Sequence, residues 1–452
     1  MQKLVYQTPP KEWMEGLPIG NGRLAAMVWG DNLDRLTLNH EWLWTGRNKG
    51  RKVRQSAEGL PLVREAIRNG EHFVATALAN SFFGGKGGIS GIPGRVDDYQ
   101  PAGELDFQLA GENSFVSREL DIRTGVAKVC RKSGGALVNG EFFADCVGQC
   151  LSARWESETP FSGTLFISRE AEEGTEVSVA AKETLLWLDG KISGGIQFAA
   201  QAKICTDGEV AVQGEKLSVQ NAKYIQLVIN MATSQKDLEQ ELAAYDLDAA
   251  QYEQAKARHI DRFSDVMGRL DFVLEGDEKF SSLPTDERLR RVKEGEIDNG
   301  ISALYFDFGR YLLVSSSICG ELPANLQGKW NDSLTPPWNC DYHFDINLQM
   351  NYWMAEPAGM PECAKALIRY VRSFLDSGRE AAKKLYGCRG IFLPIQTDAW
   401  GISTPESYGW AAWIGAAPWI ARHLWDHYRY SGDLEYLKNE AYEFFAAVAE
   451  FY

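Results

Sequence analysis

The residues whose types and spacing best suit chemistry lie in a polar, aromatic-rich stretch from Glu321 to Trp353. Within it, polar and apolar residues alternate strictly from His343 to Leu348. In an extended strand this alternation places the side chains of His343, Asp345 and Asn347 on one face. An imidazole, a carboxylate and an amide side by side supply the donors and acceptors that sugar hydroxyl groups need. The alternative interpretation is a polar strand face that meets only solvent.

Aromatic side chains surround this alternating segment. Trp330 and Trp338 precede it, and Tyr352 and Trp353 follow it. A flat ring can pack against the apolar face of a pyranose, so we expect this stretch to bind a sugar. Trp338 follows two consecutive prolines, whose rigidity favours a segment held against the rest of the fold. We therefore predict that Trp338 is a substrate-binding residue.

The composition is that of a soluble globular protein with room for two or three domains. The chain has 452 residues, of which 44% are hydrophobic and 24% are charged. Its net charge of −15, from 47 basic and 62 acidic residues, argues against nucleic acid or membrane partners and favours a neutral substrate. No run reaches the roughly 18 apolar residues of a transmembrane helix. The N-terminus lacks a signal-peptide pattern, so we predict a cytoplasmic protein unless a leader was removed before the numbering begins.

Cysteine and histidine spacing predicts no metal site, and nothing in the chain predicts a cofactor. The eight cysteines are scattered along the sequence, a pattern typical of reduced thiols. Cys146 and Cys150 have no matching cysteine or histidine pair downstream, so a zinc site is not expected. His423 and His427 are one helical turn apart, but they lack an intervening glutamate and a third ligand. We interpret both histidines as packing residues.

The chain changes character along its length. Short alternating segments between Gly, Asp and Asn turns dominate the first half and are typical of β-sandwiches. Residues 234–266 have a strongly helical pattern, with Ser234 as a plausible N-cap. From Thr285 onward, amphipathic helices alternate with loops that carry most of the unusual residues. This order is typical of an α-helical toroid with its site in the loops at one rim.

Two glycine-rich segments resemble nucleotide-binding loops but lack their context. The loop from Gly84 to Gly94 does not end in the Gly-Lys-Ser/Thr of a P-loop. Gly20 to Ala25 has the G-x-G-x-x-A spacing of a dinucleotide site, but no buried strand precedes it and β-like sequence follows. We interpret its two glycines as positions where the backbone turns too tightly for side chains. A nicotinamide-dependent oxidoreductase is the functional class that this spacing alone would support.

Long blocks of the sequence resemble glycoside hydrolase family 95, the 1,2-α-L-fucosidase family. The blocks around the candidate site are LPANLQGKWNDSLTPPW (322–338) and INLQMNYW (346–353). Further blocks follow in the same order along almost the whole chain: LPIGNGRLAAMVWG (17–30), LTLNHEWLWTG (36–46), YQPAGEL (99–105), FGRYLLVSSS (308–317), QTDAWG (396–401) and HLWDHYRYSGD (423–433). The resemblance implies a multidomain β + α fold: an N-terminal β-sandwich-like domain (1–233), a helical linker (234–284) and the first part of an (α/α)6 barrel (285–452).

The resemblance also implies removal of terminal α-linked L-fucose from an oligosaccharide or glycan, with inversion at the anomeric carbon. Inversion needs an acid for the leaving oxygen and a base for the attacking water. In the family, two asparagines two residues apart hold that water, helped by a downstream aspartate. The second falls on Asn347, whereas the first falls on Asp345. His343 matches a family histidine that contacts the sugar.

Asp345 changes this chemistry, because a carboxylate can take the proton of the water directly and an amide cannot. We predict that Asp345 is the catalytic base and that Asn347 orients the water. The alternative is that Asp345 binds a sugar hydroxyl or a backbone amide. The family places its acid in a Pro-Ser-x-Ser-Pro-Glu segment, which does not occur up to Tyr452. We therefore expect these residues to be a fragment of a longer protein; otherwise the product lacks general-acid catalysis.

A second candidate block contains Gln396, Asp398 and Trp400, in a loop of the right type to reach the same pocket. Asp398 could equally be a helix cap or an ordinary loop carboxylate. The family more often has a histidine just before its Thr-Asp, where this chain has residues 394–396 as Pro-Ile-Gln. This departure and Asp345 leave the sugar open between L-fucose and the closely related L-galactose. A non-catalytic carbohydrate-binding relative is the remaining alternative.

Overall fold

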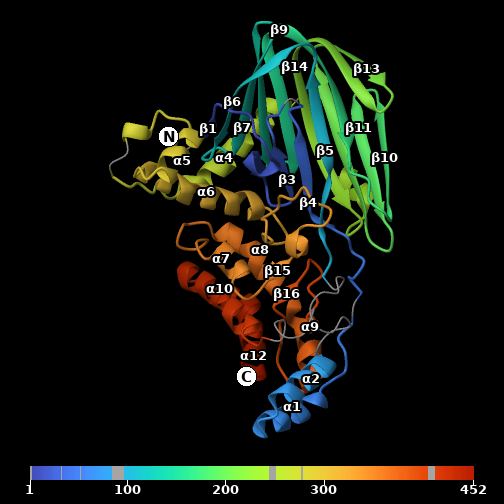
Figure 1. Cartoon of the computed structure of the whole chain (residues 1–452), viewed down its shortest axis with the longest axis vertical. Helices are drawn as coiled ribbons and strands as arrows, with labels where there is room; N and C mark the ends of the chain where they lie inside the picture. Colours follow the sequence, from blue (N-terminus) through green and yellow to red (C-terminus); the bar gives the residue numbers. More distant parts are fainter. Residues whose placement is uncertain are drawn as a thin grey trace. The chain divides into compact units, whose positions relative to one another are not determined.

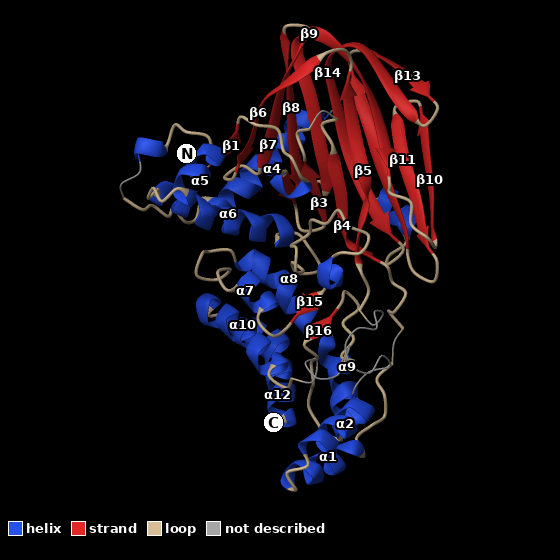
Figure 2. Cartoon of the chain, in the orientation of Figure 1, coloured by secondary structure: helices blue, strands red, loops and turns tan. Residues whose placement is uncertain are grey.

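The structure is a computed structural model that describes residues 3–31, 33–50, 52–83, 96–243, 251–275, 278–405 and 413–452. The chain divides into two compact units whose segments alternate along the sequence. The sheet unit comprises Met1–Leu43, Gln100–Gly320 and Gly328–Leu334, and the helical unit comprises Trp44–Tyr99, Glu321–Gln327 and Thr335–Tyr452. Figure 2 distinguishes the strands of the first unit from the helices that dominate the second. The predicted multidomain β + α fold class is confirmed.

The sheet unit is built on a 14-stranded sheet (Figure 1). Its long path runs β1-β6-β7-β8-β9-β14-β12-β11-β10, β13 pairs with β14, and a branch β5-β4-β3-β2 starts at β9. Each pair with a described register is antiparallel. The strands are β1 (Lys3–Tyr6), β2 (Leu17–Gly20), β3 (Leu24–Val28), β4 (Leu36–Trp44), β5 (Tyr99–Leu109), β6 (Asn113–Asp121), β7 (Val126–Ser133), β8 (Ala136–Asp145), β9 (Cys150–Ser168), β10 (Thr175–Lys182), β11 (Leu185–Ile192), β12 (Gln197–Thr206), β13 (Glu209–Gln213) and β14 (Lys216–Thr233).

Side-chain burial alternates along the strands, as a sheet with one buried face requires. In β11, Leu186, Leu188 and Ile192 are buried, whereas the residues between them are more exposed. Gly190 continues the buried face and leaves room for the ring of Phe198 on β12, which would lie 2.0 Å from an added Cβ. The core of this unit therefore follows from the two-residue period of the sequence.

The glycine motif from Gly20 to Ala25 forms the turn between β2 and β3, an antiparallel hairpin rather than a βαβ unit. The Asn21 side-chain oxygen accepts the N–H groups two and three residues further on, at 3.0 and 2.8 Å. Gly22 has a φ of +93°, and an added Cβ would lie 2.4 Å from the Gly320 nitrogen. The turn is therefore too tight for a side chain, in agreement with the structural interpretation of this motif.

Helices of the sheet unit are anchored to the sheet through buried contacts. In α4, Tyr252 and Ala255 pack against Val126 and Phe143. In α6, the Tyr311 hydroxyl donates to the carbonyl of residue 18 at 2.6 Å. The helices are α3 (Leu238–Ala243), α4 (Tyr252–Met267), α5 (Thr285–Lys293) and α6 (Asn299–Ser317), with the short turns η1 (Trp13–Glu15) and η3 (Glu278–Phe280). Helix α6 therefore belongs to the sheet unit, although it follows Thr285 in the sequence.

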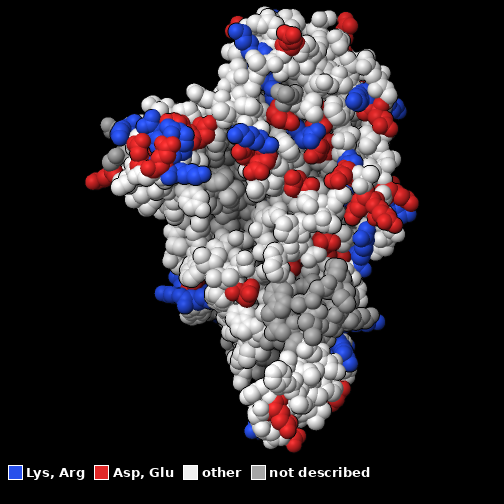
Figure 3. Space-filling model, viewed as in Figure 1, with Lys and Arg blue, Asp and Glu red and all other residues white. Residues whose placement is uncertain are grey.

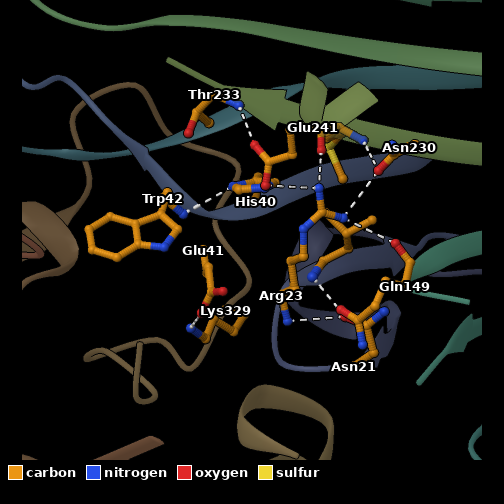
Figure 4. Close-up of polar contacts among 12 residues, drawn as sticks. Asn21, Arg23, His40, Glu41, Trp42, Gln149, Asn230, Thr233, Glu241 and Lys329 are labelled. Carbon is orange, nitrogen blue, oxygen red and sulfur yellow. Dashed lines mark hydrogen bonds and ion pairs between the residues drawn. The ribbon is translucent and has the colours of Figure 1, made fainter. Parts of the chain in front are cut away.

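A network of buried charged side chains lies within the sheet unit (Figure 4). Arg23 Nη2 lies 3.2 Å from Glu241 Oε1, and Arg23 Nη1 donates to Asn230 Oδ1 at 3.1 Å. Glu241 Oε2 accepts the Thr233 N–H at 3.3 Å. Arg23 comes from the β2–β3 hairpin and Glu241 comes from α3, so their ion pair ties this helix to the sheet.

The same network contains a second ion pair and a histidine. Lys329 Nζ lies 3.2 Å from Glu41 Oε2, and each side chain is 2% exposed. His40 Nδ1 accepts the Trp42 N–H at 3.1 Å (Figure 4). Burial, followed by the positive charge of Arg23, lowers the pKa of His40 well below its usual range. The imidazole is therefore neutral at pH 7.

The helical unit consists mainly of helices joined by loops. Helices α1 and α2 pack on the segment from α9 to Phe392 through small and apolar side chains: Val63, Ala66, Ala75, Phe83, Ala381, Ala382, Leu385 and Phe392. Its helices are α1 (Gly59–Arg68), α2 (His72–Phe83), α7 (Asn347–Tyr352), α8 (Pro361–Arg372), α9 (Phe374–Ala381), α10 (Ala416–Ser431), α11 (Leu434–Tyr436) and α12 (Tyr442–Phe451). Shorter elements are η4 (Pro337–Cys340), the π-helical turns η5 (Ala382–Tyr386) and η6 (Leu437–Ala441), β15 (Tyr342–His343) and β16 (Gln396–Thr397).

Acidic and basic side chains are interspersed on the face drawn in Figure 3, most densely along α5. There Arg290 pairs with Glu287 and Glu294 at 2.8 and 2.5 Å.

Among the helices that the structure describes, none is long and apolar enough to cross a bilayer. The compact units do not decide the predicted boundaries after residues 233 and 284, which stay a prediction.

Candidate active site

Two very short strands bring the two candidate blocks together in the helical unit. β15 pairs antiparallel with β16, and His343 lies opposite Gln396. The Phe344 N–H donates to the Ile395 carbonyl at 2.7 Å and extends this pairing. Side chains that are 53 residues apart in the sequence therefore meet at one place.

The longer strand predicted from His343 to Leu348 is wrong. β15 ends at His343 and α7 begins at Asn347, so positions 343, 345 and 347 do not share a strand face. The Gln349 amide donates to the Phe344 carbonyl at 2.6 Å, a local contact that replaces a partner strand. Leu348 is buried as the alternation suggested, but its burial belongs to a helix.

A buried acid and an amide hold His343. Its Nε2 lies 2.7 Å from Asp341 Oδ1 and 3.0 Å from Gln396 Nε2. Asp341 is fully buried, and His343 is 8% exposed. The short contact with a carboxylate requires a proton on Nε2, because a bare nitrogen would face another acceptor. Asp341 therefore selects the protonation state of this ring nitrogen.

That proton also decides how the Gln396 amide is oriented. With Gln396 Nε2 toward the imidazole, two donors would face each other. Gln396 Oε1 is buried and has no hydrogen-bond partner within the described part of the chain. Rotating the amide by a half turn places this oxygen where it can accept the His343 N–H. The imidazole is then held by two acceptors, the Asp341 carboxylate and the amide oxygen.

Trp338 lies beside the imidazole on an unusual backbone. The two rings meet edge to face, with centroids 5.8 Å apart and planes at 87°. Trp338, Asn339 and Cys340 have φ values of +56°, +56° and +54°, which are costly for residues other than glycine. The Asn339 amide donates to Asp98, and the Cys340 thiol donates to Asn325 at 3.1 Å. These contacts hold the turn, and the indole is left 58% exposed.

The two predicted catalytic residues lie beyond the short strand. Asp345 is partly exposed, and its Oδ1 is buried with no hydrogen-bond partner among the residues that the structure describes. Asn347 is the first residue of α7 and is exposed. One carboxylate oxygen of Asp345 is therefore left for a group that none of the described residues supplies.

Asp398 and Trp400 meet an acid that comes from the segment before β5. The Trp400 indole N–H donates to Asp97 Oδ2 at 2.6 Å, and the Thr45 hydroxyl donates to Asp97 Oδ1, also at 2.6 Å. The carboxylate of Asp398 is fully buried and accepts the backbone N–H groups of Asp97 and Trp400 at 2.9 and 3.1 Å. This geometry favours the loop-carboxylate interpretation of Asp398. Trp400 is partly exposed, and its contact with a substrate stays a prediction.

Buried aromatic rings support the two short strands. The Tyr342 ring lies 5.5 Å from Trp44 and 4.6 Å from Tyr370, centroid to centroid. Phe344 packs edge to face on Phe374 at 5.5 Å. The Tyr370 hydroxyl also donates to the carbonyl of residue 398 at 2.6 Å. These rings fix the backbone from which the polar side chains project.

Sequence reasoning missed Asp341 and Asp97, the acids that orient the predicted residues. Asp341 lies two positions before His343, and this same-face spacing could have suggested the contact. Asp97 is 303 residues from Trp400, and no local pattern connects the two. Trp330 was expected near the candidate site, but it packs in the sheet unit and donates to the Ile19 carbonyl at 3.0 Å.

Potential metal ligands do not gather at this site. Within the described ranges, no three or more His, Cys, Asp or Glu residues form a group that could hold a metal ion. His427, one of the paired histidines, has its Nδ1 2.6 Å from Glu356 Oε1 and packs on the ring of Tyr436. This contact agrees with its interpretation as a packing residue.

Comparisons with known proteins agree with these blocks. Residues 251–452 match the glycosyl hydrolase family 95 catalytic domain, and residues 4–237 match the glycosyl hydrolase family 65 N-terminal domain. The likeness to glycoside hydrolase family 95 thus lies in residues 251–452. It covers the segments that carry Trp338, His343, Asp345, Asn347 and the 396–400 block.

Two curated relatives are fucosidases by name. The chain is 30% identical to "Alpha-L-fucosidase 2" of Arabidopsis thaliana, over 97% of its own length and 57% of that protein. It is 26% identical to "Probable alpha-fucosidase A" of Aspergillus niger, over 96% of its own length and 58% of that protein. The chain thus spans less than two thirds of the length of these relatives.

A solved structure shares the fold. It is described as "Putative kojibiose phosphorylase from human microbiome", and the two match with a TM-score of 0.65 at 11% sequence identity. The match covers 100% of this chain and 59% of the other. At this identity the match is informative about the fold alone, and it supports a large sheet domain followed by helices.

Proposed function

We propose that the protein is an inverting exo-glycosidase that removes terminal α-linked L-fucose from oligosaccharides or glycans. The observation that carries this proposal is the pairing of His343 with Gln396 in a region that matches the family 95 catalytic domain. The pairing places an imidazole, a buried carboxylate and an exposed indole side by side. These are the groups that hold the hydroxyls and the apolar face of a sugar. The names of the relatives support fucose as that sugar.

In the proposed mechanism, Asp345 removes a proton from the water that attacks the anomeric carbon. The side chain is partly exposed, and its buried Oδ1 lacks a hydrogen-bond partner in the described part of the chain, so the carboxylate is not already committed to a protein donor on that side. Asn347 is two positions away and exposed at the start of α7, where its amide can orient the same water. In this mechanism Asp345 accepts the proton, and Asn347 orients the water toward the anomeric carbon.

His343 and Trp338 bind the sugar in this proposal. Asp341 and Gln396 fix the imidazole before any ligand arrives, so little conformational entropy is lost when a hydroxyl binds to it. Trp338 is held by its turn with more than half of its surface exposed, at 58%. Its ring can therefore cover the apolar face of the deoxy sugar without a large rearrangement.

Inversion also needs a general acid. The family resemblance places this acid in a segment beyond Tyr452, and its position stays a prediction. A substrate whose leaving group departs without protonation tests the role of Asp345 separately from the acid. α-L-Fucosyl fluoride is such a substrate, because fluoride leaves as a stable anion.

The test uses the 452-residue chain with α-L-fucosyl fluoride. We expect hydrolysis that releases β-L-fucose, detected by proton NMR before the anomers equilibrate, and we expect Asp345→Asn to abolish it. Release of the α-anomer would contradict inversion. Equal turnover by wild type and Asp345→Asn would contradict the role of Asp345 as the base.

The alternatives are separated by the same assay. α-L-Galactosyl fluoride differs from the fucosyl substrate by one hydroxyl, and faster turnover of it would identify an α-L-galactosidase of the same family. Binding of L-fucose without turnover of either fluoride would identify a non-catalytic carbohydrate-binding relative. Either result would contradict the proposed function and would identify which alternative function is correct.

A further inference from the structure

Two cysteine thiols that are far apart in the sequence meet in the sheet unit, whereas the candidate active site belongs to the helical unit. Cys146 lies in the turn between β8 and β9, and Cys319 lies two residues after α6. The Cys319 thiol donates to the Cys146 carbonyl at 3.2 Å, across a separation of 173 residues. The two thiol groups also interact electrostatically. All eight cysteines are reduced in this structure.

The surroundings make the two sulfurs chemically unequal. The adjacent Cys146 thiol, followed by the positive charge of Arg262, lowers the pKa of the Cys319 thiol. The adjacent Cys319 thiol and burial raise the pKa of Cys146. Cys319 is partly exposed, whereas Cys146 is 4% exposed. An accessible, acidic thiol therefore lies against a buried, protonated one.

We propose that Cys319 and Cys146 form a peroxide-sensitive pair, in which Cys319 is oxidised first and Cys146 converts it to an intramolecular disulfide. This arrangement joins a reactive cysteine to a neighbouring resolving cysteine, as in redox-responsive sites generally. Neither cysteine is among the residues assigned to sugar binding or catalysis, so the inference does not depend on the proposed function.

The chemistry balances with hydrogen peroxide as the oxidant. The Cys319 thiolate attacks one peroxide oxygen, the O–O bond breaks, and the sulfur becomes a sulfenic acid while hydroxide leaves and takes the thiol proton as water. The Cys146 sulfur then attacks the Cys319 sulfur, the S–O bond breaks and a second water leaves with the Cys146 proton. Two thiols lose two electrons in total, and one peroxide becomes two waters.

The disulfide would fix the point at which the chain leaves the sheet unit. The segment from Ser315 to Gly320 is already held at the β2–β3 turn, where the Gly22 N–H donates to Ser315 and the Cys319 N–H donates to Asn21, at 2.8 and 3.1 Å. The next residues, Glu321–Gln327, belong to the helical unit. A covalent bond at Cys319 would therefore prevent the end of α6 from separating from the β8–β9 turn.

The primary experiment treats the 452-residue chain with hydrogen peroxide and maps its peptides by mass spectrometry without reduction. We expect a peptide pair linked through Cys146 and Cys319, a fall of two in the count of eight free thiols, and reversal by dithiothreitol. We also expect a higher unfolding midpoint for the oxidised chain, because the link closes a long loop. Absence of the linked pair while other cysteines are oxidised would overturn the proposal.

Two variants separate the roles of the cysteines. Cys146→Ser should leave a sulfenic acid at Cys319 that dimedone labels, whereas Cys319→Ser should give neither the label at this site nor the link. Cys130→Ser is the matched control, because Cys130 is also partly exposed but burial raises its pKa, and it should leave the link unchanged. Dimedone labelling of Cys130 or Cys388 as fast as that of Cys319 would contradict the assignment, even if a variant folds poorly.

Discussion

The buried charges of the sheet unit and the polar cluster at β15–β16 differ in how completely their groups are paired. In the sheet unit, the cations Arg23 and Lys329 contact the anions Glu241 and Glu41, so these opposite charges are paired, although not every polar atom is (Figure 4). Some neutral groups there, such as His40 Nε2, have no hydrogen-bond partner among the described residues. At β15–β16, the imidazole of His343 is held by a buried acid, and a short distance along the chain Asp345 keeps an oxygen that no described residue satisfies.

We therefore interpret the paired charges of the sheet unit as structural and the groups at β15–β16 as candidates for catalysis. Buried ions with fully matched partners lose most of their reactivity and hold elements together. A carboxylate with an unsatisfied oxygen near solvent has a free energy cost that a bound water or substrate can remove. By this criterion, Glu241 and Glu41 stabilise the sheet unit, and Asp345 is the acid to test for catalysis.

Replacing Asp345 by Asn should have the largest effect. We expect turnover of α-L-fucosyl fluoride to fall by about 100- to 10,000-fold with little change in KM, because the amide cannot accept the proton of the water. Steady-state kinetics measure this. Asp271→Asn, at a side chain that is 68% exposed in the sheet unit, is the control and should leave turnover unchanged. Turnover close to wild type in Asp345→Asn would mean that another carboxylate is the base.

Replacing Lys329 by Met should damage the sheet unit instead. We expect the free energy of unfolding to fall by about 3–5 kcal/mol, because Glu41 would keep a buried charge without its ammonium partner. Urea unfolding measures this. Lys279→Met removes an exposed pair with Glu296 and should cost less than about 1 kcal/mol. Similar losses in the two variants would show that the buried pair has no special role.

Acid should weaken the sheet unit through its buried histidines. Burial lowers the pKa of His259 from 6.5 to about 4, as it stacks on Phe143, and the pKa of His40 shifts in the same direction. Below pH 6.5 the unfolded chain binds a proton that the folded chain does not, so the free energy of unfolding falls as pH drops toward 4. For His259 the loss is about 3 kcal/mol.

Unfolding by urea at pH 7 and at pH 4.5 measures this effect. In His259→Leu the loss of stability between the two pH values should be smaller than in wild type, because one titrating group is gone. His72→Leu, at an exposed histidine of α2, is the control and should keep the wild-type difference. An unchanged difference in His259→Leu would mean that other groups account for the acid sensitivity.

Removing the exposed indole of Trp338 should have the smallest effect. We expect Trp338→Ala to weaken binding of L-fucose by about 3- to 10-fold, since one ring face contributes about 1 kcal/mol. Titration calorimetry on the wild type and the variant measures this. Phe73→Ala, at a side chain that is 94% exposed on α2, should not change affinity. Equal affinity in Trp338→Ala would exclude the indole from the binding surface.

Much of the fold could be predicted from the sequence because it depends on local patterns. The two-residue period gives the buried face of β11, and helices follow from Thr285 onward as the sequence suggested. The tight turn at Gly20 to Gly22 followed from the size of glycine. These features need only neighbouring residues, which a single sequence displays.

The candidate site could be predicted only in part, because its contacts are not local. The alternation from residue 343 suggested a strand, but β16 supplies only two partner residues and α7 takes the chain from Asn347 onward. Asp97 reaches Trp400 across 303 residues, and one sequence cannot reveal such a contact. The sequence therefore indicated which residue types form the site, but not how their side chains are arranged.

In the left-handed turn at Trp338–Cys340, the residue that best suits the backbone differs from the residue that best holds the indole for sugar binding. Glycine at position 339 would adopt its φ of +56° more readily, but it would lose the amide contact with Asp98 that helps to hold the indole. Laboratory evolution for heat resistance alone should thus favour glycine in this turn. The resulting variants would be more thermostable proteins that distinguish sugars less well.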